Sequence, residues 1–354
     1  MRKSFVPARF PRCALAALLF GIAAPAAFGA DTGTLTDVTF TEYTPLSSNA
    51  ELARRMLSPL TAAQIPRLLE QSGKKLAEQP VNLADEKFAL YVPAREPSTG
   101  YALLVFVAPW DSAKLPDGWA PLLDQYGTIF VTPARAGNEM NMLARREPLA
   151  LLAEQNVAHR YRIDPEHVFI GGFSGGSRVA MRLALGYPDV FRGAILNAGS
   201  DLIGTAETPL PPRDLFQQFQ EFSHIVFATG ERDNVNLSSD RATMHSMRDW
   251  CVFNTDEHFS PYVTHEIVST AVLSQALDSL FHPAPPDAAK LAACRSAVES
   301  ELSAKLAQVE SLIAAGQSDS AGEQLKDIDG RFGGLAAPRS VELEERLHGS
   351  TSSP

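Results

Sequence analysis

Short apolar runs recur along the middle of the chain, and segments with helical periodicity separate them. The runs are mostly continuous in hydrophobic character, which is typical of strands that are buried on both faces. They cover residues 87–92, 102–107, 128–132, 167–171, 193–197, 224–229 and 258–263. Helical patterns lie between them at residues 144–159, 177–185, 238–249 and 270–280. This alternation predicts an α/β fold with a mostly parallel central sheet flanked by helices.

Two flanking segments lie outside this unit of residues 85–283. Residues 30–84 contain one strand-like run, 37–43, and two helical segments, 50–56 and 62–76, to which the pattern assigns no role.

The second flank follows a proline-rich break at residues 282–286. Apolar residues at helical spacing over 288–314 and a shorter helical segment at 322–328 predict a C-terminal helical hairpin. We therefore expect a helical extension at residues 284–348 and a disordered tail at 349–354. A truncated helical-repeat module is the alternative interpretation of the extension.

The first 29 residues have the pattern of a secretory signal peptide. Four basic residues precede an apolar run at 13–24, and small residues follow at 25–30. The run is shorter than the roughly 20 residues that a membrane-spanning helix needs. We expect this segment to be cleaved, which predicts a periplasmic or extracellular protein without a stable membrane anchor.

Composition limits the class of protein and its partners. The chain has 354 residues, of which 45% are hydrophobic and 20% charged, as in an ordinary globular protein. Residues 1–29 carry four basic and no acidic side chains, so their removal changes the formal net charge from −10 to −14. A protein of this charge offers no basic surface to a phosphate backbone, which argues against a nucleic-acid partner.

Cysteine usage agrees with an oxidising compartment. Cys13 lies in the predicted signal peptide, so Cys251 and Cys294 remain as an even pair. We favour a disulfide between them over two free buried thiols. Cys and His residues do not occur in close pairs with metal-ligand spacing, and the sequence therefore predicts no metal site.

The candidate chemistry centres on the string Gly-Phe-Ser-Gly-Gly at residues 172–176. Such a string alone is weak evidence, but here it follows an apolar run and opens a helical pattern, which is the context of a nucleophile elbow. Gly172 and Gly176 lack a Cβ, so strand and helix can approach closely while the hydroxyl of Ser174 is exposed. We predict Ser174 as a nucleophile; a plain glycine-rich turn, with or without a bound anion, is the alternative.

A serine nucleophile requires a carboxylate and a histidine later in the chain. Asp233 follows the strand-like run 224–229, and its place in the loop suits a side chain that orients an imidazole. Glu231, Asp240 and Asp256 compete for this role, and the alternative for Asp233 is that it only caps the helix that follows it.

The base is predicted from its place in the loop after the last strand. His265 lies between the run 258–263 and the last helix of the unit, where the catalytic loop should be. His258 is expected at the wrong end of that strand and His245 within a helix, so we interpret both as structural.

An oxyanion hole needs backbone N–H groups that point at the attacked carbonyl oxygen. Gly175, directly after the nucleophile, is expected to supply one of them. The second should come from the loop after residues 102–107, where Pro109 has no N–H and Trp110 is the favoured donor, with Asp111 behind it. A packing role for Trp110 is the equal alternative.

Residues 161–200 resemble the α/β-hydrolase superfamily, and within it the secreted esterases similar to polyhydroxybutyrate depolymerases and feruloyl or acetylxylan esterases. The resemblance covers about residues 85–283 and rests on the flanks of the nucleophile, Ile-Asp-Pro at 163–165 and Tyr-Pro-Asp-Val-Phe at 187–191. It implies acyl transfer through a covalent serine ester, without a cofactor, by a triad of Ser174, Asp233 and His265.

The sequence departs from this group at two places. Ala-Pro at 108–109 replaces the usual His-Gly of the oxyanion loop, and Val-Thr at 263–264 precedes His265 where a glycine often stands. We expect a serine hydrolase that cleaves small-molecule or polymer-linked carboxylic esters. A serine peptidase on the same fold and a non-catalytic secreted binding protein are the alternatives. Fold-level analogy identifies neither the substrate nor the oligomeric state.

Overall fold

The structure is a computed structural model that describes residues 31–350, with side chains described to residue 348. The predicted signal peptide and residues 351–354 of the predicted tail lie outside the described residues.

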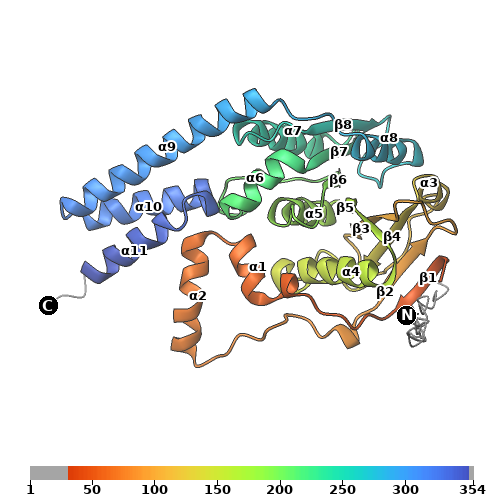
Figure 1. The fold of residues 1–354 in the computed structure, drawn as a ribbon, viewed down its shortest axis with the longest axis horizontal. Coiled ribbons are helices and arrows are strands. Elements are labelled where there is room, and N and C mark those ends of the chain that lie inside the picture. Colours follow the sequence, from red (N-terminus) through yellow and green to blue (C-terminus); the bar gives the residue numbers. More distant parts are fainter. Residues whose placement is uncertain (1–30, 351–354) are drawn as a thin grey trace, which may run out of the picture. The chain divides into compact units, whose positions relative to one another are not determined.

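The centre of the fold is one eight-stranded sheet with the strand order β1-β2-β4-β3-β5-β6-β7-β8 (Figure 1). β2 runs antiparallel to β1 and to β4, and every other neighbouring pair is parallel. The strands are β1 (Gly33–Val38), β2 (Phe88–Val92), β3 (Tyr101–Val107), β4 (Thr128–Pro133), β5 (Ile163–Phe173), β6 (Gly193–Asn197), β7 (His224–Gly230) and β8 (Thr255–Ser260). The predicted α/β fold with a mostly parallel sheet is confirmed.

Helices cover both faces of this sheet. The helices of the sheet unit and its N-terminal flank are α1 (Asn49–Met56), α2 (Pro59–Ser72), α3 (Ala120–Gln125), α4 (Glu147–Arg160), α5 (Gly175–Gly186), α6 (Arg213–Phe222), α7 (Asn234–Asp249) and α8 (Thr270–Phe281). Leu103 and Val105 of β3 join a core with residues of α4 and α5, whereas Leu104 and Phe106 join a second core with residues of α8. Alternate residues of a strand thus enter opposite cores, which explains the continuous apolar runs.

Two strands end earlier than the apolar pattern indicates. β8 stops at Ser260 because Pro261 has no N–H for the ladder and Tyr262 follows with a φ of +62°. β1 ends at Val38, and Asp37, with a φ of +53°, lies at an irregularity in the pairing of β1 with β2 between Leu35 and Val38. The strand expected at 258–263 therefore lies three residues earlier in the chain, and the strand expected at 37–43 begins four and ends five residues earlier.

The C-terminal extension contains three helices where the sequence predicted two. They are α9 (Ala288–Ala314), α10 (Ser318–Phe332) and α11 (Arg339–Ser350), and α11 continues into the expected tail. Leu325 of α10 and Leu343 of α11 are buried in the same core as the helices of the sheet unit. α11 was missed because its sequence is rich in glutamate and arginine and carries few apolar positions.

The N-terminal flank links the sheet unit to this extension. Arg55 of α1 forms a bidentate ion pair with Asp189, at 2.6 and 2.9 Å, just beyond α5. At the start of α2, the backbone N–H of Leu60 donates to the Asp329 carboxylate of α10 at 3.1 Å. The flank, to which the sequence assigned no role, therefore contacts both parts of the chain.

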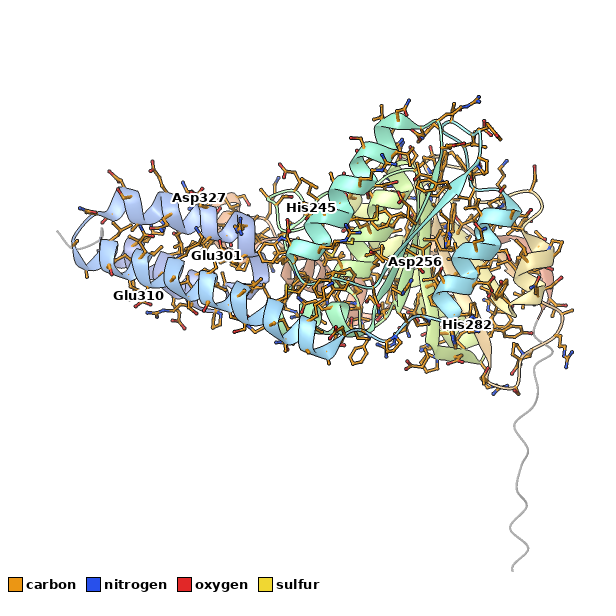
Figure 2. The ribbon with its side chains drawn as sticks, turned by 90° about the horizontal axis from the view of Figure 1, so that it is seen from above. His245, Asp256, His282, Glu301, Glu310 and Asp327 are labelled. Carbon is orange, nitrogen blue, oxygen red and sulfur yellow. A yellow bond between two sulfur atoms is a disulfide. The ribbon has the colours of Figure 1, made fainter. Side chains whose placement is uncertain are left out.

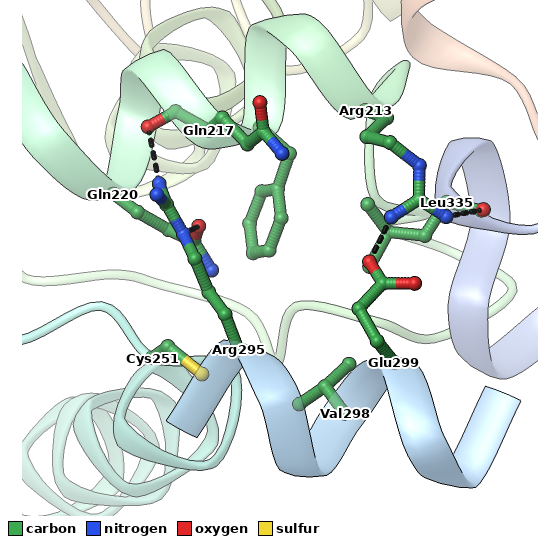
Figure 3. A pocket seen from close by; sticks show the side chains of 9 residues that line it. Arg213, Gln217, Gln220, Cys251, Arg295, Val298, Glu299 and Leu335 are labelled. Atoms are coloured by element: carbon green, nitrogen blue, oxygen red, sulfur yellow. Dashed lines mark hydrogen bonds and ion pairs between the residues drawn. The ribbon is translucent and has the colours of Figure 1, made fainter. Parts of the chain in front are cut away.

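α9 also packs against α6 of the sheet unit. Arg213 of α6 pairs with Glu299 of α9, and Arg295 of α9 donates to Gln220 and to the carbonyl oxygen of Gln217 (Figure 3). These residues line an open pocket of about 70 Å³ between the two helices.

None of the helices within residues 31–350 combines the length and apolar character needed to cross a membrane.

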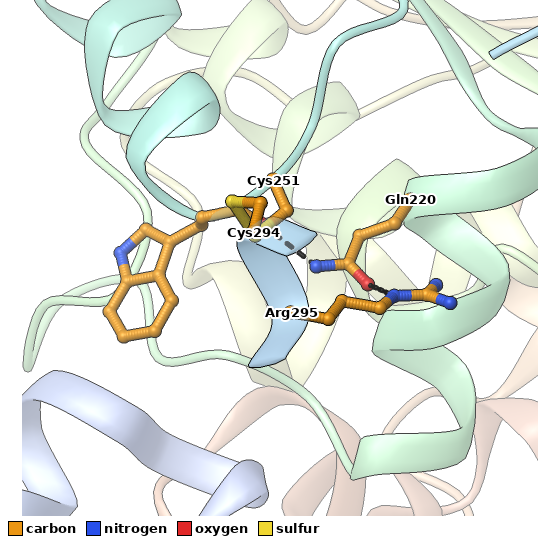
Figure 4. Close-up of a disulfide and its surroundings, with 5 residues drawn as sticks. Gln220, Cys251, Cys294 and Arg295 are labelled. Carbon is orange, nitrogen blue, oxygen red and sulfur yellow. Dashed lines mark hydrogen bonds between the residues drawn. A yellow bond between two sulfur atoms is a disulfide. The ribbon is translucent and has the colours of Figure 1, made fainter. Parts of the chain in front are cut away.

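A disulfide joins Cys251, just after α7, to Cys294 of α9, as the sequence predicted (Figure 4). Beside it, Gln220 donates to the carbonyl oxygen of Trp250 at 2.8 Å and accepts from Arg295 at 2.6 Å. The disulfide thereby anchors the extension at a point where it also contacts α6.

We expect reduction of this disulfide to lower the free energy of unfolding by about 2–4 kcal/mol, because the bond closes a long loop in the unfolded chain. The two cysteines are 43 residues apart in sequence. Urea unfolding with and without a reductant measures the effect, and a Cys251→Ala/Cys294→Ala variant is the control that should not respond to the reductant. An unchanged midpoint for the wild-type protein would contradict the prediction.

Candidate active site

Ser174 lies in a sharp turn between β5 and α5. Its φ of +55° and ψ of −122° are strained for a residue with a side chain. A Cβ on Gly172 would lie 2.3 Å from the carbonyl oxygen of Gly176, and one on Gly176 would lie 1.9 Å from that of Val107. A side chain at either glycine would therefore collide with backbone, so the close approach of β5, α5 and β3 depends on both.

The structure brings Asp233, His265 and Ser174 together at the carboxyl edge of the sheet. His265 Nε2 lies 2.9 Å from Ser174 Oγ, and His265 Nδ1 lies 2.7 Å from Asp233 Oδ2. Asp233 follows β7, and His265 lies in the loop between β8 and α8. The three side chains, which are far apart in sequence, form one continuous hydrogen-bonded chain.

The loop before His265 approaches β7 very closely. The N–H of Arg232 donates to the carbonyl oxygen of Val263 at 2.9 Å. A Cβ on Gly230 would lie 2.1 Å from the carbonyl oxygen of Thr264. A glycine on β7, rather than one directly before His265, thus gives this loop the room it needs.

Asp233 both caps α7 and contacts the imidazole, so the two roles considered for it coexist. Its Oδ1 accepts from the backbone N–H of Asn236 at 3.4 Å, and its Oδ2 accepts from Asn236 Nδ2 at 2.8 Å as well as facing His265. Burial raises the pKa of Asp233, but the hydrogen bonds from His265 and Asn236 outweigh it and hold the pKa below its ordinary value. Asp233 is therefore ionised at neutral pH.

Asn236 is a site residue that the sequence reasoning missed. Its amide also lies 3.1 Å from His265 Nδ1, so it borders the contact between His265 and Asp233. The available signal was an asparagine three residues after a helix-capping aspartate, where a short polar side chain can turn back toward the cap.

The competing carboxylates have other partners. Glu231 accepts from the backbone N–H of Tyr262 at 3.0 Å. Asp240 is fully buried and accepts from Ser200 and Thr229 at 2.5 and 2.6 Å.

The third competing carboxylate and the other two histidines also lie away from Ser174. Asp256 pairs with His224 at 3.0 Å, near the opposite edge of the sheet. His258 bonds to Ser279 of α8, and His245 is exposed on α7 (Figure 2). Within residues 31–350, no group of three or more His, Cys, Asp or Glu side chains is arranged to hold a metal ion.

The expected oxyanion donors lie on two adjoining elements. Gly175 is the first residue of α5, where a backbone N–H has no acceptor inside the helix. The N–H of Trp110, in the loop after β3, donates to no residue within 31–350. The indole of Trp110 also packs 6.1 Å from the Phe173 ring, which in turn lies 4.9 Å from that of His265. The two interpretations of Trp110, donor and packing residue, are thus compatible.

Comparison with known proteins gives one curated relative and many partial structural likenesses. No protein-family model matches the chain. A poly(3-hydroxybutyrate) depolymerase of Ralstonia pickettii is 29% identical over 168 residues, which cover 40% of this chain and 34% of that protein. The match therefore spans about a third of the length of this relative.

Esterases and peptidases are among the solved structures that match, all at low identity. An acetyl xylan esterase from Aspergillus awamori is 12% identical with a TM-score of 0.43, covering 56% of this chain and 94% of that one. An esterase of Thermogutta terrifontis is 15% identical with a TM-score of 0.40, and the match covers 57% of this chain and 89% of that one. Dipeptidyl peptidase 4 of Porphyromonas gingivalis is 13% identical with a TM-score of 0.41, and the match covers 56% of this chain and 34% of that one.

The fold follows from the molecule itself. The sheet is parallel from β3 onward, its second strand is antiparallel, and a strained serine turn joins β5 to α5. The chain therefore has the α/β-hydrolase fold, and its resemblance to a polyhydroxybutyrate depolymerase is confirmed over 168 residues.

Proposed function

We propose that the protein is a serine hydrolase that cleaves carboxylic esters through Ser174, His265 and Asp233. One arrangement carries the proposal: Ser174 Oγ lies 2.9 Å from His265 Nε2, while His265 Nδ1 lies 2.7 Å from Asp233 Oδ2. A serine hydroxyl is a weak nucleophile at neutral pH unless an adjacent base takes its proton, and the short contact with His265 supports the proposal that His265 is that base.

Asp233 fixes the tautomer that the reaction needs. Its ionised carboxylate accepts a hydrogen bond, so the proton of neutral His265 is on Nδ1 and the lone pair is on Nε2. His265 Nε2 takes the Ser174 proton while Oγ forms a bond to the ester carbonyl carbon, and the carbonyl oxygen becomes an oxyanion. Collapse of this intermediate breaks the bond to the alkoxy group, which leaves as an alcohol with the proton from His265.

Water completes the cycle by the same route. His265 Nε2 takes a proton from a water molecule, whose oxygen attacks the acyl carbon bound to Ser174. The second tetrahedral intermediate releases the acid and returns the proton to Ser174 Oγ. The N–H groups of Gly175 and Trp110 are the backbone donors proposed to stabilise both oxyanions.

We further propose that the protein works in the periplasm or outside the cell on small-molecule or polymer-linked esters. The disulfide between Cys251 and Cys294 fits an oxidising compartment, and the N-terminal 29 residues have the pattern of a signal peptide. The matched relative is named for depolymerising a polyester, which supports including polymeric esters among the substrates tested.

A fluorophosphonate probe tests the proposal and does not require the substrate to be identified. We expect wild-type protein to be labelled at Ser174, as located by mass spectrometry, because the probe reacts with an activated serine. Ser174→Ala and His265→Ala should abolish labelling.

Ser98→Ala, which changes an exposed serine before β3 at the other edge of the sheet, is the matched control and should label normally. Folded wild-type protein that resists labelling would overturn the proposal. Labelled protein that cleaves peptide amides but no esters would replace the esterase with a peptidase.

A further inference from the structure

The loop after β4 brings the side chain of Asn138 against the first residue of α5. A Cβ built on Gly175 would lie 2.2 Å from Asn138 Oδ1 and 3.1 Å from Asn138 Nδ2. The amide therefore occupies the space that a side chain at position 175 would need. Gly175 directly follows Ser174, so Asn138 lies beside the residue whose N–H is the first proposed oxyanion donor.

The backbone of Asn138 is held to the loop after β3. Its N–H donates to the carbonyl oxygen of Pro109 at 3.0 Å. The N–H of Gly137 donates to the Asp111 carboxylate at 3.0 Å, and the N–H of Arg135 donates to the Asp111 carbonyl oxygen at 2.7 Å. Three hydrogen bonds thus fix Asn138 relative to the loop that contains the second proposed donor.

Arg146 fixes the orientation of the Asn138 amide. Its guanidinium is buried, with 2% of the residue exposed, and donates to the carbonyl oxygens of Ala136 and Ala108 at 2.8 and 3.2 Å. It also faces Asn138 Oδ1 at 3.4 Å. Because a guanidinium carries donors only, the amide oxygen turns toward Arg146 and the amide nitrogen turns away.

The amide nitrogen of Asn138 is left without a protein acceptor. The side chain is exposed, and Nδ2 donates no hydrogen bond to any residue within 31–350. An N–H donor without a protein acceptor beside the nucleophile turn is suited to stabilise a developing oxyanion, once its amide nitrogen is directed at that charge.

We propose that Asn138 Nδ2 is a catalytic donor of the oxyanion hole, acting together with the backbone N–H of Gly175. This inference rests on the proposed function. Pro109 removes one backbone N–H from the loop after β3. A side-chain donor from the neighbouring loop compensates for that loss, and a glycine at position 175 gives it room.

Kinetics of Asn138→Ala on an activated ester such as p-nitrophenyl acetate test this role. We expect kcat to fall about 10²- to 10³-fold, as for loss of one oxyanion donor, with KM changed less than about threefold. Asn138→Asp keeps the shape but removes the donor and adds a negative charge, so its loss should be at least as large.

Glu139→Gln is the matched control in the same loop. Its side chain is exposed and forms no hydrogen bond or ion pair with another residue within 31–350. We expect its kcat to stay within about threefold of wild type at a temperature where all variants are folded.

A double-mutant cycle that combines Gly175→Ala with Asn138→Ala separates the proposed role of Asn138 from a general disturbance of the active-site structure. The added methyl group must displace the Asn138 amide, so Gly175→Ala alone should lower kcat strongly. In the Asn138→Ala background the methyl group has room and should lower kcat much less, which makes the two effects non-additive.

The outcomes are distinguishable from failure of the proposed function. If Ser174-dependent hydrolysis is present but Asn138→Ala keeps kcat within about threefold of wild type, the oxyanion role alone is wrong. A rise in KM with unchanged kcat would make Asn138 a contact for the bound substrate and would also overturn the proposal. If hydrolysis survives Ser174→Ala, the proposed function and this inference are both wrong.

Discussion

Ser174→Ala is expected to lower kcat for ester hydrolysis by about 10⁴- to 10⁶-fold, because the covalent route disappears with the nucleophile. The remaining residues would still bind substrate and polarise its carbonyl, so a small rate above that in water is expected. Steady-state kinetics on an activated ester measure the loss. The far-ultraviolet circular dichroism spectrum shows whether the variant is folded.

Ser177, three residues further along, is the matched control for this substitution. It is fully buried, and its hydroxyl donates to the carbonyl oxygen of Gly199. Ser177→Ala removes a buried hydrogen bond and is expected to lower the melting temperature, with kcat within about tenfold of wild type. If Ser174→Ala kept most of the activity, a covalent intermediate at Ser174 would be excluded.

The central sheet could be predicted from sequence because its strands are hydrophobic at the positions that face both sides of the sheet. Leu103 and Leu104 are neighbours in β3 and enter opposite hydrophobic cores, so the apolar run in the sequence coincides with the strand.

The bounds of β8 were predicted less accurately. Its residues are mostly half-buried, and its end depends on Pro261 and on the left-handed backbone of Tyr262.

In the candidate site, too, some features depend on neighbouring residues in the sequence and others on residues far apart in it. The turn at Ser174 depends on a segment of five residues, and Gly172 and Gly176 indicate this turn in the sequence. Asn138 left no such signal. Its contact with Gly175 joins two segments 37 residues apart and depends on the buried guanidinium of Arg146, which no local pattern reveals.

The third C-terminal helix and the N-terminal flank were difficult for a related reason. α10 is held to α2 by a bond from the Leu60 N–H to the Asp329 carboxylate, and α1 is held beyond α5 by the pair of Arg55 with Asp189. Both contacts bring together residues more than 130 positions apart in sequence. Amphipathic spacing predicts a helix, but it does not identify the surface against which the helix packs.

Asp233→Asn is expected to lower kcat by about 10⁴-fold at neutral pH while the geometry of the site is retained. The carboxylate accepts from His265 Nδ1 at 2.7 Å, whereas an amide can present its NH₂ group there. The imidazole would then be protonated on Nε2, where it cannot take the Ser174 proton. Glu231→Gln changes the neighbouring carboxylate, which among residues 31–350 bonds only to the backbone of Tyr262, and should keep kcat within about threefold.

The pH dependence of stability gives an independent test of the charge on Asp233. Its pKa in the folded protein is held below the ordinary value, so its ionised form stabilises the fold above the unfolded-state pKa of about 4. That stabilisation is lost as the pH falls through the lower folded pKa. Urea unfolding should therefore show wild type more stable than Asp233→Asn at pH 7, with the difference shrinking below about pH 4. If the difference were the same at both pH values while kcat still fell, the loss of kcat would come from the exchange of an acceptor for a donor opposite His265 Nδ1 and not from the charge of Asp233.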